Sequence, residues 1–167
     1  WEVLARKLGE NHGVLVYERA GINHSDRSDE ERTPSNIAKE LKNLLDQIPH
    51  DEKLLIIGHS QGGLYASEFC GLFLEIVKGL ILLDPLSKED IRFKKELTAS
   101  ELKRAGADKS KNFTVLETMV KLGLKGLVKK VMRKAPPFCY ADFSGEEKED
   151  ILNSLVNISH LHTCREE

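Results

Sequence analysis

Short apolar runs alternate with amphipathic helical patterns along the first half of the chain. Residues 14–17, 54–57 and 80–83 are such runs, typical of strands that are buried on both faces. Apolar residues recur at helical spacing over residues 1–8, 33–48 and 61–73, and Thr33 followed by Pro34 is a favourable helix start. This alternation predicts an α/β fold with a doubly wound, mostly parallel sheet covered by helices.

The second half of the chain is helical, charged and without a convincing strand pattern. We expect one helix over residues 114–134, with an apolar face surrounded by lysines and arginines, and another near residues 146–156. The apolar face of the first consists of Leu116, Met119, Val120, Leu124, Leu127 and Val131. Because the character changes after Pro85, we expect a sheet-containing part at residues 1–86 and a helical part at residues 87–167.

Composition narrows the possible partners and cofactors. The formal net charge of −2 argues against a general attraction to nucleic acid, and no apolar run is long enough to be inserted across a membrane. Cys70, Cys139 and Cys164 are scattered and form no CxxC pair, so no zinc site or disulfide framework is indicated. Free thiols that fill core space favour a cytoplasmic protein, and no metal or organic cofactor is implied.

The segment Gly58-His59-Ser60-Gln61-Gly62 lies between the second apolar run and the helix that follows it. Gly-x-Ser-x-Gly in this context is a nucleophile elbow, a tight turn that holds the serine in a strained conformation with its Oγ accessible. We expect a Cβ at Gly58 or Gly62 to collide with neighbouring elements, and Gly63 to serve the same purpose. The backbone N–H of Gln61, at the start of the helix, can donate to a developing oxyanion.

Three further segments accompany the elbow: residues 17–26 with the sequence YERAGINHSD, Arg32-Thr33 before an amphipathic helix, and residues 79–85 with the sequence GLILLDP. Together with the elbow they resemble the α/β-hydrolase superfamily, in its branch of small esterase, proline iminopeptidase and haloperoxidase-like enzymes. Glu18 departs from the usual Asp of this loop, and Ile22-Asn23 from the usual Tyr-Gly. The resemblance covers residues 1 to about 88, and it implies that residues 89–167 form a helical cap or lid.

The same resemblance implies that the chain is a fragment lacking both ends of the family fold. Trp1 falls at the start of the first core helix, so the loop that supplies the second oxyanion N–H is expected before residue 1. The family's acid and histidine follow later strands, so both are expected after residue 167. On this basis the fragment itself is expected to be inactive.

Several residues within the chain are candidate partners of Ser60. His59 precedes the serine on a strand and is expected to point to the opposite face, with a packing role. His24 lies in a loop at the correct edge of the sheet and is a weaker candidate, as is Asp84, for which a structural role at the strand end is preferred. His160 and His162 are expected in a surface or cap role, and His12 and His50 are expected to be solvated.

The expected function is that of a serine hydrolase which cleaves a small carboxylic ester through an acyl-enzyme on Ser60. Peptide, lactone and carbon–carbon bond hydrolysis stay open, because the same elbow supports them. A non-catalytic ligand-binding or signalling module, and an acyltransferase or perhydrolase, are alternative functions. The basic helix at residues 114–134 could lie on a membrane, but covering the active-site mouth is the favoured interpretation. The expected partner is a small-molecule substrate, and the sequence gives no oligomeric state.

Overall fold

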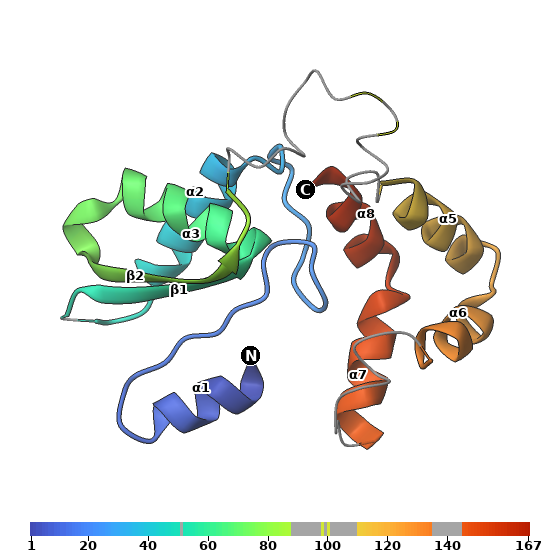
Figure 1. The fold of residues 1–167 in the computed structure, drawn as a ribbon, viewed down its shortest axis with the longest axis horizontal. Coiled ribbons are helices and arrows are strands. Elements are labelled where there is room, and N and C mark those ends of the chain that lie inside the picture. The colour runs from blue at the N-terminus through green and yellow to red at the C-terminus, as the bar shows by residue number, and fades with distance from the viewer. Residues whose placement is uncertain (51, 88–97, 99, 101–109, 135–144) are drawn as a thin grey trace.

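The computed structural model describes residues 1–50, 52–87, 98, 100, 110–134 and 145–167, with the side chains of Glu2, Val3, Ser110 and Lys111 left aside. Its elements in the first half are α1 (Glu2–Gly9), α2 (Pro34–Leu45), β1 (Leu54–Ser60), α3 (Gln61–Leu72), the 3₁₀ turn η1 (Leu74–Ile76) and β2 (Val77–Pro85). The second half contains α5 (Ser110–Lys121), α6 (Lys125–Met132), α7 (Gly145–Leu155) and α8 (Ile158–Glu166). Figure 1 shows these elements as a sheet-containing region and a helical region that lie side by side.

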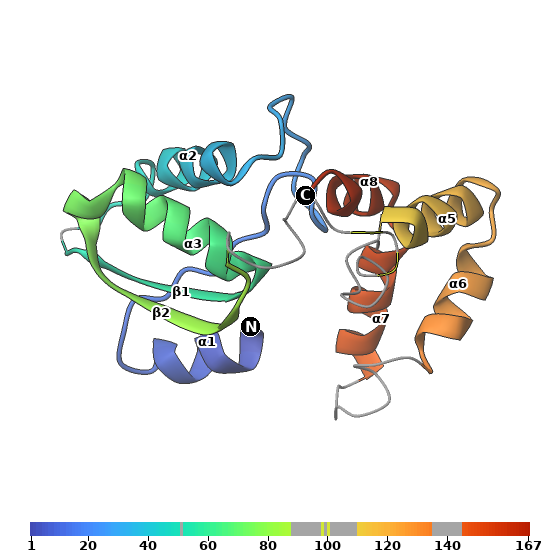
Figure 2. The ribbon, with the colours of Figure 1, turned by 45° about the horizontal axis from the view of Figure 1, so that its top comes forward.

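The strands β1 and β2 pair in parallel, and α3 connects them as the crossover helix. Their register runs from Leu54 opposite Val77 to Ser60 opposite Pro85, so both strands end at the same edge. The helices α2 and α3 lie together on one side of this sheet and α1 lies on the other, as both ribbon views show (Figures 1 and 2). The expected strand–helix–strand unit with helices on both sides is therefore confirmed.

The helix α2 is built and capped as the sequence predicts. Thr33 has extended backbone angles, its Oγ1 accepts a hydrogen bond from Asn36 N–H at 3.3 Å, and Pro34 occupies the first turn. One face of α2 then packs against α3 and β2 in a cluster of buried residues. This first core consists of Ala38, Leu45, Phe69 and Val77.

The strand expected over residues 14–17 is not formed. This segment runs as an extended coil without ladder hydrogen bonds, and Val14, Leu15 and Val16 are all exposed. The prediction rested on apolar content alone, whereas a strand also needs a neighbour that accepts and donates its backbone hydrogen bonds. In the described part of the chain the sheet has two strands, and this segment is not one of them.

The helical region corrects one further expectation and contains one helix that was not foreseen. Residues 114–134 form two helices rather than one, because Gly123 adopts a positive φ of 80° and breaks the pattern between α5 and α6. The helix expected near residues 146–156 is confirmed as α7. The helix α8 was not foreseen, although Asn157 caps it by accepting a hydrogen bond from Ser159 N–H at 2.9 Å.

A second core holds these four helices together. It consists of Val120, Val128, Val156 and Leu161, with Phe113, Leu116, Met119 and Met132 packed against it. The apolar face expected over residues 114–134 is therefore only partly buried. Its α5 residues Leu116, Met119 and Val120 lie in this core, whereas Leu124, Leu127 and Val131 are exposed. Consequently α6 does not use that face to cover the elbow. None of the described helices is long and apolar enough to cross a bilayer.

Candidate active site

Ser60 is the last residue of β1 and lies directly before α3. Its backbone has φ 52° and ψ −126°, which is rare for a residue with a Cβ and indicates local strain. Its carbonyl accepts a hydrogen bond from Leu86 N–H at 2.8 Å, which ties the turn to the end of β2. The residue is exposed, so the turn presents its side chain at the edge where both strands end.

The glycines around Ser60 allow the strand and the helix to approach closely, but not at all the expected positions. A Cβ on Gly58 would lie 2.6 Å from Gly62 O and 2.8 Å from Ala66 Cβ, and one on Gly63 would lie 2.4 Å from Pro85 Cβ. A Cβ on Gly62 would meet nothing within 4 Å. The expected collision at Gly62 is therefore wrong, because this position of α3 faces open space. The close contacts belong to Gly58 and Gly63.

Gln61 is the first residue of α3, so its backbone N–H has no acceptor within the helix and lies at the positive end of the helix dipole. Its side chain is also engaged. The Nε2 group contacts the Tyr65 hydroxyl at 2.6 Å and donates to the Glu167 carbonyl at 3.3 Å. Gln61 is thereby held from within α3 and from the end of α8, next to the serine.

Asp84 lies at the same edge as Ser60. It precedes Pro85, the register partner of Ser60, and adopts a positive φ of 43° where β2 becomes irregular. Its side chain is exposed, and among the described residues no hydrogen bond or ion pair involves its carboxylate. The structural role expected for Asp84 at the strand end therefore stays a prediction.

No histidine of the described chain is hydrogen-bonded to Ser60 Oγ. The ring of His59 packs edge-on against the indole of Trp1, with the ring centroids 6.4 Å apart, so its side chain turns towards α1. The side chain of His24 is 86% exposed, and its Nδ1 lies 3.4 Å from Glu18 Oε2. Slight burial would raise the pKa of Glu18, but hydrogen bonds from His24 N–H and Asn23 Nδ2 outweigh it and lower this pKa. The structure therefore places His24 with Glu18 in the surface loop.

The other histidines have structural or solvent-exposed positions. His160 is half-buried on α8, where its Nδ1 accepts a hydrogen bond from Asn23 N–H at 3.4 Å. Burial lowers its pKa, assisted by the charge of Arg19. His162 contacts Arg165 and Glu166 on the same helix. His12 and His50 are exposed, as expected.

A cluster of charged side chains next to Gln61, partly or almost fully buried, was not foreseen from the sequence. Arg19 donates to both carboxylate oxygens of Glu167, at 3.1 and 2.5 Å, and its guanidinium stacks 5.0 Å from the centre of the Tyr65 ring. Arg32 donates to both oxygens of Glu40, at 2.7 and 2.9 Å, and lies 3.4 Å from Glu167 Oε1. The side chains of Arg32 and Glu167 are almost fully buried. Glu167 is 148 positions from Arg19 and 135 from Arg32, too far apart in sequence for any local pattern to have paired them.

The charge cluster shifts the pKa values of its members. Burial would lower the pKa of Arg19, but its hydrogen bonds and charge interaction with Glu167 outweigh this and raise it. Burial, together with the negative charge of Glu167, raises the pKa of the Tyr65 hydroxyl well above its ordinary value. Tyr65 is therefore a neutral phenol at physiological pH, able to act as a hydrogen-bond partner of Gln61.

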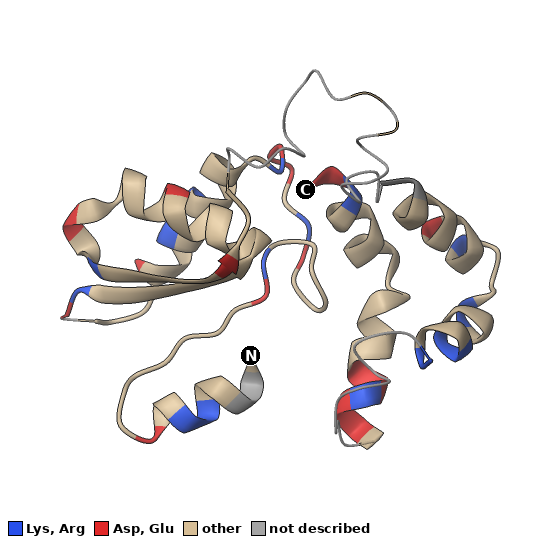
Figure 3. Ribbon diagram, in the orientation of Figure 1, with Lys and Arg blue, Asp and Glu red and all other residues tan. Residues whose placement is uncertain are grey.

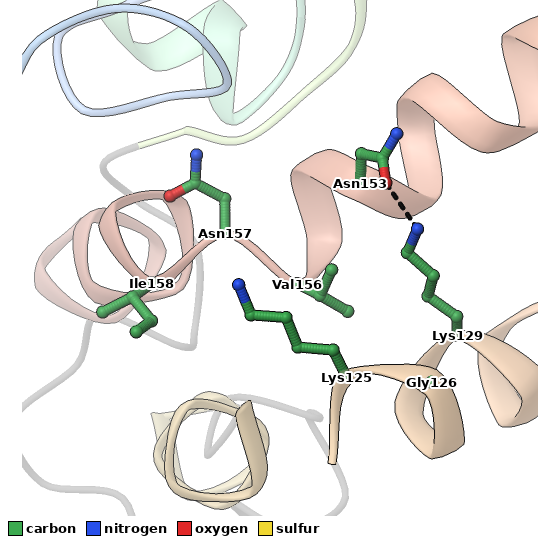
Figure 4. A pocket seen from close by; sticks show the side chains of 7 residues that line it. All are labelled: Lys125, Gly126, Lys129, Asn153, Val156, Asn157 and Ile158. Carbon is green, nitrogen blue, oxygen red and sulfur yellow. Dashed lines mark hydrogen bonds between the residues drawn. The ribbon is translucent and has the colours of Figure 1, made fainter. Parts of the chain in front are cut away.

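Two cavities accompany these features, and neither is lined by Ser60, Gln61 or Asp84. One, of about 540 Å³, lies between α6, α7 and the start of α8, with Lys125, Lys129, Asn153 and Asn157 among its lining residues (Figure 4). The other, of about 320 Å³, lies beside the loop that contains Glu18 and Ser25. Within the described ranges no group of three or more metal-ligating side chains was found.

The cysteines fit a packing role where they are described. Cys70 and Cys164 are free and half-buried, and Cys139 lies outside the described residues. Burial raises the pKa of the Cys164 thiol to about 11, and burial also raises that of Cys70. Both thiols are therefore protonated at physiological pH, which suits small core residues better than nucleophiles.

Comparison with known proteins relates most of the chain to one family. The model of the alpha/beta hydrolase fold family matches residues 1–119. Over 85 residues the chain is 31% identical to the "Uncharacterized protein YqjL" of Bacillus subtilis (strain 168). This matched stretch covers 51% of this chain and 34% of that relative. The chain thus spans about a third of the length of the curated relative it matches.

Proposed function

Because the chain belongs to the alpha/beta hydrolase fold family, we propose that it carries the nucleophile of a serine hydrolase. Ser60 is that nucleophile, and the substrate is a small carboxylic ester. The observation that carries this proposal is the conformation of Ser60, a non-glycine residue at φ 52° between a parallel strand and a helix.

Strain at a serine in this position favours a functional role over a chance turn. Holding a residue with a Cβ in such a conformation costs on the order of 1–3 kcal/mol, and it persists only where the surroundings impose it. Here Gly58 and Gly63 allow β1, α3 and the end of β2 to come together around the turn. A turn without a function could relieve the strain by placing glycine at position 60.

The proposed chemistry is acyl transfer to water. Ser60 Oγ attacks the ester carbonyl carbon and gives its proton to a general base, while the Gln61 N–H donates to the oxygen that becomes negative. The tetrahedral intermediate expels the alcohol, which takes up a proton, and leaves an acyl group on Oγ. Water then attacks this ester, the carboxylic acid departs, and Ser60 recovers its proton.

The general base and the acid of the triad are expected from parts of the protein other than the described residues. Asp84 is the favoured acid among the described residues, because it ends the strand next to that of Ser60 and its carboxylate is not engaged there. His24 is the weaker candidate for the base, because its side chain is directed to solvent and to Glu18. A base within the chain is the alternative that the experiments below distinguish.

A non-catalytic ligand-binding or signalling module is the second candidate function. The observation that favours it is that Ser60 Oγ is not hydrogen-bonded to a histidine in the described part of the chain. An elbow without a base would still offer a polar, accessible turn to a ligand. Transfer of the acyl group to an acceptor other than water would use the same nucleophile, and varying the acceptor in an assay separates it from hydrolysis.

We expect a fluorophosphonate probe to label the full-length protein at Ser60. Ser60→Ala should abolish the labelling, whereas Ser67→Ala, a matched change on the exposed side of α3, should retain it. Equal labelling of the wild type and Ser60→Ala would refute the assignment. Mass spectrometry of the labelled peptide provides the measurement.

The 167-residue chain by itself should hydrolyse p-nitrophenyl acetate barely faster than its Ser60→Ala variant. Members of a catalytic triad act as a unit, so a serine without a base loses most of its rate advantage. Robust turnover that depends on Ser60 would show that the base is within the chain, and His24 and Asp84 would be the first residues to substitute. If the full-length protein also fails to hydrolyse p-nitrophenyl acetate, the non-catalytic binding module is favoured.

We also propose a cytoplasmic location. The free thiols of Cys70 and Cys164 support it, because unpaired thiols persist most readily in a reducing compartment. Fractionation of cells with an antibody to the protein tests this placement, and recovery in a secreted or periplasmic fraction would contradict it.

A further inference from the structure

The helix α6 has two apolar faces, and only one of them is packed. Val128 is buried and Met132 packs beside it in the second core. Leu124, Leu127 and Val131 recur at spacings of three and four residues, so they form one row along the other side. They are 42%, 50% and 60% exposed. Such a row of exposed aliphatic side chains has no role in the fold of the described chain.

The turn between α5 and α6 adds to this apolar surface. Leu122 is 72% exposed and precedes Gly123, whose positive φ turns the chain into α6. Both ribbon views place α6 at the outer edge of the helical region, on the side away from the sheet (Figures 1 and 2). We define the α6 stripe as Leu122, Leu124, Leu127 and Val131.

The α6 stripe lies within the most basic segment of the chain. Residues 121–134 contain six lysines and arginines and no acidic residue, although the whole chain has a formal net charge of −2. Figure 3 shows this basic charge gathered on α6. Lys121, Lys129 and Arg133 pair with glutamates. Among the described residues no ion pair involves Lys125, Lys130 or Lys134, so these charges can be used by a partner.

We propose that the α6 stripe and the lysines beside it form a binding surface for anionic phospholipid membranes. Leucine and valine side chains of a helix lying in the interface enter the boundary between headgroups and acyl chains. Lysines beside such a stripe keep their stems along the apolar surface and extend their ammonium groups to lipid phosphates. The surface is peripheral, because α6 has only eight residues and cannot cross a bilayer.

Charge distinguishes a membrane from a second copy of the chain. A symmetric dimer through the α6 stripe would place the same basic segment of both copies face to face, and like charges across an interface oppose association. An anionic membrane instead supplies both an apolar layer for the leucines and phosphates for the lysines. Lys125 lines the neighbouring cavity, so its ammonium group is less available to lipid phosphates (Figure 4). Lys130 and Lys134 are therefore the lysines whose loss should matter most.

Flotation of the 167-residue chain with lipid vesicles tests the proposal. We expect binding to phosphatidylcholine vesicles containing about 30% phosphatidylserine, little binding to pure phosphatidylcholine vesicles, and weakening with added salt. Lys130→Glu with Lys134→Glu should reduce binding by roughly tenfold or more. Lys39→Glu with Lys53→Glu changes the net charge equally at exposed sites of the other region and should have a much smaller effect.

The apolar contribution needs its own variant and readout. Leu127→Ser with Val131→Ser should weaken binding without altering the circular dichroism spectrum, because both side chains are exposed. In a Trp1→Phe background, Leu127→Trp should shift its fluorescence to shorter wavelength when vesicles are added. Equal binding of both double variants and the wild type would overturn the proposal. So would a dimer of the wild type on gel filtration that Leu127→Ser with Val131→Ser converts to a monomer without affecting flotation.

Discussion

The sheet-containing region and the helical region each bury an apolar cluster of their own. In the first, Phe69 of α3 is fully buried between α2 and β2. In the second, Val120 of α5 and Leu161 of α8 are buried together. Burial of such side chains contributes about 1.5–3 kcal/mol each. Each region therefore has an independent source of stability.

The contacts between the two regions are of a different kind. Arg19 pairs with Glu167, Asn157 Nδ2 donates to Asn23 O at 3.1 Å, and Ser159 Oγ contacts Gly21 O at 3.4 Å. These are polar interactions between α8 and the loop that precedes α2. Interfaces between domains are commonly more polar than cores, so this difference supports the division near residue 86, which stays a prediction. Stability within each region should therefore depend on packing, and docking on charge.

The largest expected effect comes from truncating one core at a time. Phe69→Ala should lower the free energy of unfolding by about 3–5 kcal/mol and Leu161→Ala by about 2–5 kcal/mol, because each leaves a cavity. If the cores are independent, each change should weaken amide-hydrogen protection in its own region first. Hydrogen exchange read by mass spectrometry measures this. Leu74→Ala, at a 70% exposed position, is the control. An equal loss of amide-hydrogen protection in both regions would show that the two cores do not stabilise their regions independently.

A smaller effect is expected from the charges between the regions. Arg32→Met should cost about 2–3 kcal/mol in urea denaturation, because it leaves the buried Glu167 and the partly buried Glu40 with fewer donors. Arg27→Met removes an exposed pair with Glu166 and should cost less than about 0.5 kcal/mol. If both substitutions lower the free energy of unfolding by a similar amount, burial of the Arg32 ion pairs adds nothing to stability.

The close packing at the elbow gives an effect of about 1–2 kcal/mol. Gly63→Ala would place a methyl group 2.4 Å from Pro85 Cβ, so the end of β2 must move. Gly62→Ala meets open space and should be neutral or stabilise α3 slightly, because alanine favours a helix. Thermal denaturation of this matched pair measures the difference. A Gly62→Ala variant that is the less stable of the two would contradict the structure.

Local signals predicted much of the sheet-containing region. Thr33 and Pro34 mark the start of α2, and the Gly-x-Ser-x-Gly spacing marks the turn from β1 to α3. Those features depend on neighbours within a few residues, which is why periodicity and capping reveal them. The strand expected at residues 14–17 failed for the opposite reason, since a strand depends on pairing that the sequence does not display locally.

The features of the site that the sequence did not predict depend on contacts between residues far apart in the chain. Glu167 reaches Arg19 across 148 positions, so no spacing rule joins them. The choice of Gly63 rather than Gly62 as the crowded glycine depends on where Pro85 returns beside α3. Gly123 was visible in the sequence, but the regular apolar spacing around it favoured a continuous helix over the break that its positive φ permits.

The smallest expected effect concerns the pH dependence of docking between the two regions, and it centres on His160. Burial and the charge of Arg19 lower its pKa below 6.5, although Glu167 and Glu18 oppose the shift. The folded state therefore binds fewer protons than the unfolded state below pH 6.5, so the stability from neutral His160 is complete above that pH and is lost as the pH falls. Protonation also turns Nδ1 into a donor, which cannot accept the hydrogen bond from Asn23. His160→Asn keeps an acceptor without this titration, so its hydrogen-exchange protection in α8 should change less between about pH 7.5 and about pH 5 than that of the wild type. The exposed His12→Asn should behave like the wild type, and an unchanged pH dependence in His160→Asn would assign the titration to another group.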